Sequence, residues 1–458
     1  MDLATMNYGF NIMKGLYMRH IGKLAAILLP SLVCSVSASA EPEQPVATLI
    51  QNATIFDGKH EALAQNMSVL IEGNSITKIA KSIPAPAGAA VIDAKGKVLM
   101  PGLTDVHWHV MFNSPSIPTL MNADMSYLTL LGAKSAEETL MRGFTTVRDV
   151  GGNPFGIKRA IDEGQYIGPR IYPSGPMISQ TSGHSDNRPS NEPEHATYLE
   201  NNYLLTVADG VPDVMVAARR NLRMGATQIK IAAGGGVSSN YDPLDVTEYT
   251  FEEMKAAVDV AKTWNTYVAI HANTDEAIQM AIKAGIRSVE HGFLMSEETL
   301  KMMAKNDVWF SMEPLLNDED AIPFPPGSEN ERKWIQVTDG TDKVIKLAKK
   351  YKVKTAFGTD ILFDAKLGQK HGKMLAKLKR WYTPYEILKM ATYDNAQLIK
   401  LCGPRDPYKG KLGVVEEGAL ADLILVDGNP LQNIDLVSDP AKNFVVIMKD
   451  GVVYKNNS

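Results

Sequence analysis

The feature that most limits the fold is a regular alternation of short apolar runs and amphipathic helical runs between Pro101 and about Leu401. Strands that alternate strictly with helices form parallel sheets, and eight such units predict an α/β fold of the (β/α)8 TIM-barrel type. An open doubly wound sheet is the alternative, but no Gly-x-Gly-x-x-Gly motif follows the first strand to favour it. The eight expected strands are Thr104–Val110, Thr145–Val150, Arg170–Ser174, Thr227–Ala232, Tyr267–His271, Ser288–Gly292, Val308–Met312 and Lys354–Thr359.

The helical runs carry start signals of their own. In the capping-box pattern, an N-cap hydroxyl residue is followed three positions later by glutamate. We therefore expect helices to begin at three such pairs: Ser135 with Glu138, Thr250 with Glu253, and Thr383 with Glu386.

The two flanks of the alternating region have a different sequence pattern, in which short candidate strands are separated by Asp-Gly or Gly-Asn turns. We expect residues 41–100 and 411–458 to form one small composite β-sandwich domain beside the barrel of residues 101–410. Two long loops, about 176–212 and 313–335, interrupt the barrel. Loops of this length at a barrel mouth usually shape a binding pocket.

The N-terminus is typical of a secretory signal peptide. The apolar stretch from Leu24 to Val36 is too short for the roughly 20 residues that cross a bilayer. Positive residues precede it and Ala38-Ser39-Ala40 follows, so we expect cleavage after Ala40 and a periplasmic or secreted protein without a stable membrane anchor. A buried helix or a membrane anchor is the alternative. Translation could start at Met1 or at Met18.

Composition excludes several classes of protein. Hydrophobic residues make up 45% and charged residues 22% of the chain, which is ordinary for a globular protein and unlike a disordered chain, a collagen or a coiled coil. The net charge of −5 offers no basic field for nucleic acid. Two cysteines cannot build a disulfide scaffold or an all-cysteine zinc site, so the nine histidines carry the remaining metal chemistry.

Six residues of ligand type stand at the C-terminal ends of five expected strands, which is the catalytic face of a TIM barrel. Each has a simple structural alternative when taken alone: a loop pair, a salt-bridged or snorkelling lysine, a core histidine or a capping aspartate. A lysine buried in an apolar strand has a lowered pKa, and its neutral amine can capture CO₂ as a carbamate. Together they predict a metal centre. The six are His107, His109, Lys230, His271, His291 and Asp360.

This pattern resembles the amidohydrolase superfamily of binuclear metal hydrolases. The supporting motifs are Val98-Leu99-Met100-Pro101-Gly102-Leu103-Thr104-Asp105-Val106-His107-Trp108-His109 and Glu417-Gly418-Ala419-Leu420-Ala421-Asp422-Leu423-Ile424. Three further stretches are similar to prolidase-like metallocarboxypeptidases of the imidazolonepropionase-related branch: Thr145-Thr146-Val147-Arg148-Asp149, Thr181-Ser182-Gly183-His184 and Gly234-Gly235-Gly236-Val237. The resemblance covers about residues 47–456. A similar branch of the family hydrolyses the amide of ochratoxin.

The resemblance implies two divalent metal ions, with zinc as the expected metal and carbamylated Lys230 between them. His107, His109 and Asp360 would hold one ion, and His271 and His291 the other. Two cations lower the pKa of a bound water towards neutrality. Asp360 would accept the proton of that water and pass it to the departing amine.

Several other residues are expected to contact the substrate or to support the structure. His184 is expected to donate to the tetrahedral oxyanion or to position the scissile carbonyl, and Tyr241 to bind a substrate carboxylate. We expect Arg148 and Asp149 to form a structural ion pair, Glu290 to face away from the metals, and His371 to line the rim. His20, His60 and His195 receive no role.

The function that follows is hydrolysis of dipeptides or N-acyl amino acids with release of the C-terminal amino acid, with ochratoxin-type aromatic amides among the candidate substrates. We expect a homo-oligomer that acts on small molecules. One alternative is hydrolysis of cyclic amides, lactams or carbamates, or deamination, at the same site. A second is an exported binding protein with a catalytically silent barrel.

Overall fold

The computed structural model describes residues 47–322 and 324–458. The expected signal peptide, with its cleavage after Ala40, lies outside these residues. Within the described residues no helix combines the length and the apolar character needed to cross a membrane.

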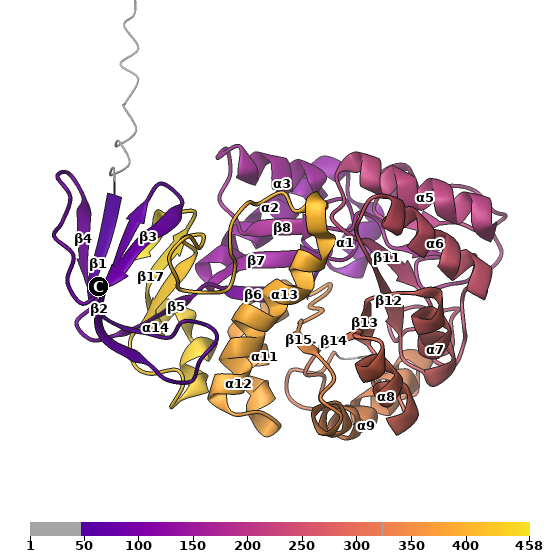
Figure 1. Ribbon diagram of the computed structural model, residues 1–458. Coiled ribbons are helices and arrows are strands. Elements are labelled where there is room, and N and C mark those ends of the chain that lie inside the picture. Colours follow the sequence, from indigo (N-terminus) through magenta and orange to yellow (C-terminus); the bar gives the residue numbers. More distant parts are fainter. Residues whose placement is uncertain (1–46, 323) are drawn as a thin grey trace, which may run out of the picture. The chain divides into compact units, whose positions relative to one another are not determined.

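All eight expected strands are present and parallel, in two hydrogen-bonded sheets (Figure 1). The first sheet has the order β6-β7-β8, with β6 at Leu103–Trp108, β7 at Phe144–Asp149 and β8 at Arg170–Pro173. The second has the order β10-β9-β11-β12-β13-β14-β15. Its strands are β9 (Ile178–Ser179), β10 (Thr206–Val207), β11 (Ile229–Ala232), β12 (Val268–Ala272), β13 (Ser288–His291), β14 (Trp309–Met312) and β15 (Thr355–Phe357).

Apart from the two-residue strand β10, which lies outside β9, the strand order follows the sequence, which differs from the reversed order of a doubly wound sheet. The strand ladders of the described residues do not close into a complete ring. Individual backbone hydrogen bonds nevertheless cross both seams. Thr227 N donates to Pro173 O (2.8 Å) between β8 and β11, and Asp360 N donates to His107 O (2.9 Å) between the end of β15 and β6.

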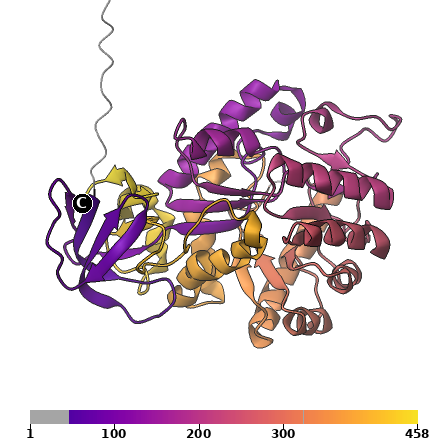
Figure 2. The same cartoon turned by 45° about the horizontal axis from the view of Figure 1, so that its top comes forward.

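Helices surround these strands in both views (Figures 1 and 2). The capping boxes at Thr250 and Thr383 are confirmed. The one expected at Ser135 is wrong, because Asp124 caps this helix eleven residues earlier and Ser135 lies buried within it. The helices between β6 and the C-terminal flank are α1 (Ile117–Asn122), α2 (Met125–Met141), α3 (Phe155–Asp162), α4 (Tyr198–Asn201), α5 (Gly210–Met224), α6 (Phe251–Thr263), α7 (Asp275–Ala284), α8 (Glu297–Lys305), α9 (Glu329–Lys350), α10 (Ala365–Gly368), α11 (His371–Lys377), α12 (Pro384–Lys389) and α13 (Asn395–Ile399).

The two expected long loops contain regular structure. The short strands β9 and β10 and the single-turn helix α4 lie within residues 176–212, and β9 pairs with β11 at Ile231. Helix α9 begins at Glu329, inside the loop expected at 313–335. The two-residue strands β9 and β10 and the single-turn helix α4 carry no detectable hydrophobic period, so the sequence pattern could not reveal them.

Strands from the two flanks lie side by side in one eight-stranded sheet, the indigo and yellow strands of Figure 1. Its order is β18-β17-β16-β5-β1-β2-β3, with β4 paired to β1, so strand pairing joins all eight into one sheet where we expected the two sheets of a sandwich. The sheet encloses its own apolar cluster. The strands are β1 (Ala47–Ile55), β2 (Ala64–Glu72), β3 (Ser75–Ala80), β4 (Ala90–Asp93), β5 (Val98–Pro101), β16 (Leu423–Val426), β17 (Phe444–Lys449) and β18 (Val452–Asn456), with α14 (Pro440–Asn443) before β17.

Candidate metal centre

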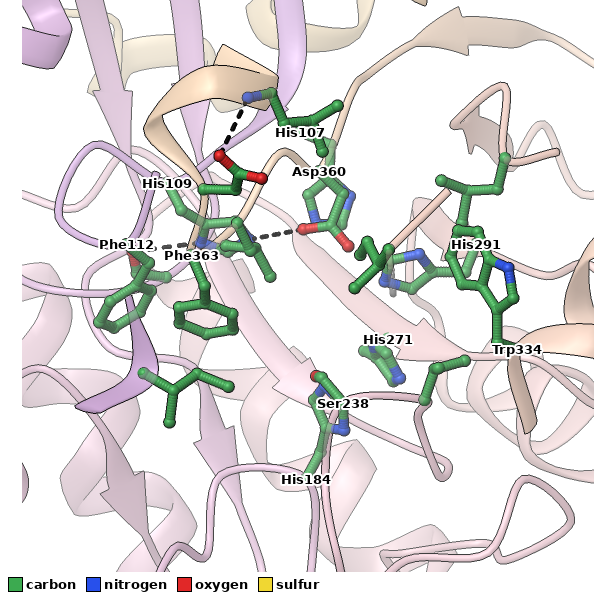
Figure 3. Close-up of a pocket in the computed structure, with 18 of the residues that line it drawn as sticks. His107, His109, Phe112, His184, Ser238, His271, His291, Trp334, Asp360 and Phe363 are labelled. Atoms are coloured by element: carbon green, nitrogen blue, oxygen red, sulfur yellow. Dashed lines mark hydrogen bonds and ion pairs between the residues drawn. The ribbon is translucent and has the colours of Figure 1, made fainter. Parts of the chain in front are cut away.

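One cavity of about 760 Å³ collects all six expected ligands and His184 (Figure 3). The expected histidine ligands and Asp360 come from the C-terminal ends of β6, β12, β13 and β15 or from the residues just after them, as the strand pattern predicts, and Lys230 comes from within β11. Parallel strands place these ends at one edge, so residues far apart in the sequence meet there.

His107, His109 and Asp360 form a compact set of possible ligands. Their ligand atoms lie within 4.8 Å of one another, and the Nε2 atoms of both histidines are 3.4 Å from Asp360 Oδ1. Asp360 Oδ1 is buried and has no hydrogen-bond partner among the described residues. Burial opposes ionisation of Asp360, but the neighbouring His107 and His109 hold its pKa well below the ordinary value. An anionic oxygen facing two imidazoles without a hydrogen bond fits a place for a cation.

His291 and His271 complete the histidine cluster. The His291 ring lies 4.3 Å from the ring of His271 and 4.8 Å from that of His107, between centroids. Glu313, which sequence reasoning missed, reaches both sides: Oε2 is 3.1 Å from His291 Nδ1 and Oε1 is 3.0 Å from His107 Nδ1. A carboxylate behind a metal-binding histidine orients the ring and raises its basicity. Glu313 follows β14 directly, so its place at a strand end was an available signal.

Lys230 stands in the middle of β11 with 1% of its surface exposed. The described residues offer it neither an ion pair nor a side-chain hydrogen bond, so the salt-bridged alternative does not hold within them. Burial lowers the pKa of its ammonium to about 8, although the nearby carboxylates oppose this shift. A substantial fraction of the amine is therefore neutral near physiological pH, as carbamate formation requires.

Two of the expected ligands have unusual backbone conformations. His291 has φ of 75° and Asp360 has φ of 48°, both in the left-handed region that non-glycine residues rarely occupy. Strained residues of this kind concentrate at functional sites. The conformation at His291 also breaks strand alternation, so that Glu290 and His291 both approach His107. The expectation that Glu290 faces away is therefore wrong: its Oε2 lies 3.2 Å from His107 Nδ1.

A buried network fixes the strand that carries His107. Asp105, missed by sequence reasoning, accepts hydrogen bonds from His107 N (2.8 Å) and Thr359 Oγ1 (2.6 Å). His371 Nε2 lies 2.8 Å from Asp105 Oδ2, and its ring stacks on Trp108. His371 was expected at the rim, but it is fully buried behind β6 and does not line the cavity. Burial lowers the pKa of its imidazole to about 4, so the ring is neutral.

Arg148 forms a buried ion pair, but with a different partner from the one expected. Its Nη2 donates to both carboxylate oxygens of Glu290 at 2.8 and 2.7 Å, and its Nε donates to Val106 O. Asp149 instead accepts hydrogen bonds from Val110 N and Gly151 N. Successive residues of a strand point to opposite sides, so Arg148 and Asp149 cannot meet.

Replacing Arg148 by methionine is expected to lower the free energy of unfolding by about 3–5 kcal/mol, because Glu290 would be left buried without a counter-charge. Both side chains are fully buried. Denaturant unfolding would measure the change. Arg159→Met, which removes an exposed helix pair with Glu163, is the control and should leave the free energy of unfolding unchanged. An equally stable Arg148 variant would contradict the argument.

His184 lies in the cavity and Tyr241 does not. The His184 ring stacks on that of His271 with centroids 3.9 Å apart, and Figure 3 shows both rings below His291. Tyr241 is 37% exposed and is absent from the cavity wall, so the structure does not bring this predicted substrate contact to the site. His195 and His60 lie outside the cavity beside Glu192 and Asp57, respectively.

The run Gly234-Gly235-Gly236 after β11 leaves no room for side chains, because other groups approach its backbone closely. A Cβ atom at Gly236 would lie 2.0 Å from His184 Cε1 and 2.7 Å from His271 Nε2. At Gly235 it would lie 1.9 Å from Pro243 O. The backbone thus packs directly against two histidine rings, and a larger residue would displace them.

Gly236→Ala is expected to lower kcat/KM about 10²-fold, since displacing reacting groups by about 1 Å costs that much. Hydrolysis rates and metal content of the purified variant would measure the effect. Gly156→Ala is a matched control, because nothing lies within 4 Å of a Cβ atom there. Full activity in the Gly236 variant would show that the His184 and His271 positions do not matter.

The walls of the cavity away from the histidines are mainly apolar, and aromatic side chains stand on opposite sides of the histidine cluster (Figure 3). Phe112 and Phe363 lie beside His109 with ring centroids 6.4 Å apart. Trp334 lies beyond His291 and contacts Phe324. Such walls suit a substrate with apolar groups.

The fold and the histidine cluster define a hydrolase built on parallel strands. Residues 98–455 match the amidohydrolase family, and the chain belongs to it. The ochratoxinase of Aspergillus niger is 30% identical over 444 residues, covering 91% of this chain and 88% of the relative. Among solved structures, a prolidase complexed with N-methylphosphonate-L-proline has a TM-score of 0.83 at 31% identity, covering 90% of this chain and 100% of its own. A Xaa-Pro dipeptidase with bound methionine has a TM-score of 0.78 at 30% identity, with the same coverage.

Proposed function

We propose that this amidohydrolase is an exported, binuclear metal enzyme that cleaves dipeptides or N-acyl amino acids and releases the C-terminal amino acid. One observation carries the proposal: all six ligand-type residues at the strand ends line a single cavity large enough for such a substrate. Relatives described as a prolidase and as an ochratoxinase support hydrolysis of a C–N bond next to a C-terminal amino acid. Export follows from the signal-like sequence before Glu41.

His107, His109 and Asp360 would hold one divalent cation, and His271 and His291 the second. The donor set of imidazoles and a carboxylate suits zinc. The unpartnered Asp360 Oδ1 and the carboxylate of Glu313 behind two of the imidazoles fit this assignment. Bound cations of this kind lower the pKa of a water molecule and polarise a carbonyl.

Lys230 is proposed to carry a carbamate that joins the two sets of ligands. The neutral Nζ attacks CO₂, forms an N–C bond and releases one proton, which leaves an anionic carbamate. Its burial without an ion pair among the described residues supports this role, since an unmodified ammonium there would lose its hydration without a direct hydrogen-bonded partner.

In the reaction itself, Asp360 takes the proton of the attacking water and transfers it to the departing amine. His184 donates to the oxygen of the scissile carbonyl as negative charge develops on it. The apolar walls hold the two halves of the substrate and exclude water from the reacting bond. Hydrophobic leaving amino acids and aromatic acyl groups, including those of ochratoxin-type amides, suit walls that contain Phe112, Phe363 and Trp334.

We also propose that strands β6 to β15 close into the (β/α)8 barrel. The sequential strand order supports this, as do the hydrogen bonds Thr227 N to Pro173 O and Asp360 N to His107 O across the two seams. A closed ring brings the strand ends around one centre, which the shared cavity requires.

The test is incubation of metal-loaded protein with a library of dipeptides, N-acyl amino acids and ochratoxin. Released amino acid and released ammonia are measured in parallel, and metal content is measured on the same sample. We expect amino-acid release that stops on chelation and returns with divalent metal. Ammonia release alone would indicate a deaminase, and no turnover despite bound metal would indicate a binding protein; either result overturns the proposal.

A further inference from the structure

Loop 236–242, which follows the glycine run, forms a second layer of contacts behind His184. Asp242 Oδ2 lies 3.0 Å from His184 Nδ1 and accepts a hydrogen bond from Gly236 N at 2.8 Å. Ser239 Oγ lies 2.9 Å from the same Nδ1 and donates to Gly236 O. Asp242 is 1% exposed. Burial would raise its carboxyl pKa, but the hydrogen bonds to His184 and Gly236 N give a net lowering.

These contacts determine which ring nitrogen carries the proton. Asp242 is an anionic acceptor, and the Ser239 hydroxyl gives its proton to Gly236 O, so both groups can only accept from Nδ1. Nδ1 must therefore be protonated, which leaves Nε2 to interact with a molecule in the cavity. Fixing one nitrogen by a carboxylate in this way selects the tautomer and the ring orientation.

The loop that carries Asp242 is itself held by a buried lysine of α9. Lys333 is 3% exposed, and its Nζ donates to the backbone oxygens of Gly236 (3.0 Å), Ser239 (3.2 Å) and Asp242 (2.8 Å). None of the ion pairs of the described residues involves this lysine. Asn330, one helical turn earlier, donates to Val237 O and Ser239 O. The Lys333 ammonium is buried against three backbone carbonyls and makes no ion pair among the described residues. Its hydrogen bonds therefore act only to hold the conformation of this loop.

We propose that Asp242 is the positioning residue for His184, and that Lys333 holds the Asp242 loop in register from α9. The inference rests on the proposed function of His184 as the donor to the scissile carbonyl. A carboxylate hydrogen-bonded to Nδ1 keeps Nε2 directed into the cavity. It also stabilises the imidazole ring when Nε2 shares a proton with a substrate oxygen. Without it, the ring can rotate or adopt the other tautomer.

The kinetic test is a double-mutant cycle of Asp242→Ala and His184→Ala, with metal content verified. We expect Asp242→Ala to lower kcat about 10²-fold with little change in KM. In the His184→Ala background it should have no further effect, because Asp242 acts through that ring. Asp245→Ala, which changes an exposed aspartate three residues after Asp242, is the control and should retain full kcat. Multiplying effects in the double variant, or an unchanged kcat in Asp242→Ala, would overturn the proposal.

Lys333→Met extends the test to the loop, with Lys343→Met, exposed on the same helix, as the matched control. We expect the Lys333 variant to reproduce the kcat loss of Asp242→Ala, and the Lys343 variant to behave as the unmodified protein. If Lys333→Met does not accumulate as folded protein, Lys333→Gln, which keeps one donor group, is measured instead. Normal kcat in a folded Lys333 variant would remove this lysine from the proposal.

A spectroscopic measurement separates this inference from the proposed function. In zinc-loaded protein with ¹⁵N-labelled histidine, we expect the His184 signals, assigned from the His184→Ala spectrum, to show a protonated Nδ1. Asp242→Ala should shift or broaden that signal, and Asp245→Ala should not. An unprotonated Nδ1 in the unmodified protein overturns the inference whether or not any amide is hydrolysed. Absence of turnover with the expected Nδ1 signal overturns the proposed function instead.

Discussion

Replacing Lys230 by methionine is expected to lower kcat/KM for amide hydrolysis by at least about 10³-fold and to reduce the content of divalent metal. Methionine fills a similar volume but cannot form a carbamate, so both sets of ligands lose the group proposed to join them. Compared in the metal-free form, the variant should unfold no more easily than the unmodified protein, because the uncarbamylated amine is buried with no ion pair among the described residues and its removal relieves an unfavourable charge.

Metal analysis, steady-state kinetics and thermal unfolding would measure these three effects. Lys366→Met, an exposed lysine at the rim of the same cavity, is the control and should retain its metal. A short carboxylic acid such as propionate is expected to restore part of the activity of the Lys230 variant by supplying an anion in place of the carbamate. Unchanged activity after the substitution would refute the carbamate and with it the joined pair of cations.

Replacing Asp360 by asparagine is expected to lower kcat by about 10²- to 10⁴-fold, which is the range that a positioned proton acceptor contributes. Asparagine keeps the shape of the side chain but cannot take the proton of the attacking water. Since the proton transfer occurs after the substrate binds, KM should change little. Pre-steady-state kinetics would show the loss in the chemical step.

The matched control for Asp360 is Asp364→Asn. Asp364 lies at the same cavity, is exposed, and caps α10 by accepting from Lys366 N and Leu367 N. Asparagine is also an effective N-cap, so this variant should keep both its fold and its kcat. Equal losses in the two variants would mean that the effect at Asp360 is a general change of charge at the cavity mouth.

The sequence predicted the strands well because each is long enough to carry an apolar pattern. It also predicted that residues from five strands would meet, because the C-terminal ends of parallel strands all lie at the same edge of the sheet. What it could not predict were the side-chain directions where the backbone departs from regular geometry. The left-handed φ of His291 breaks the strand alternation, so the His291 ring and the Glu290 carboxylate both approach His107.

The residues that support the candidate ligands and His184 from behind were not predicted, for a related reason. Asp242 and Lys333 act on residues that are distant in the sequence, and nothing in their local pattern distinguishes them from ordinary polar residues. Glu313 also acts on distant residues, but its place directly after β14 was an available signal that the sequence reasoning did not use. His371 was placed at the rim because it follows Asp360, but it turns inward to Asp105 and stacks between Trp108 and Phe144. Tertiary contacts of this kind decide burial, and sequence spacing does not.

The sheet shared by the two flanks has a consequence for the order of folding. Leu99 of β5 pairs with Leu425 of β16, and β5 is followed after a single residue by β6, which carries His107. The strand that supports the start of the catalytic region is therefore completed by a segment that leaves the ribosome late. Pairing over such a separation gives a high contact order, which slows folding and leaves the edge of β5 that faces β16 open until then, while β1 pairs with its other edge. β16 must therefore be synthesised before the strand that carries His107 and His109 has its complete supporting sheet.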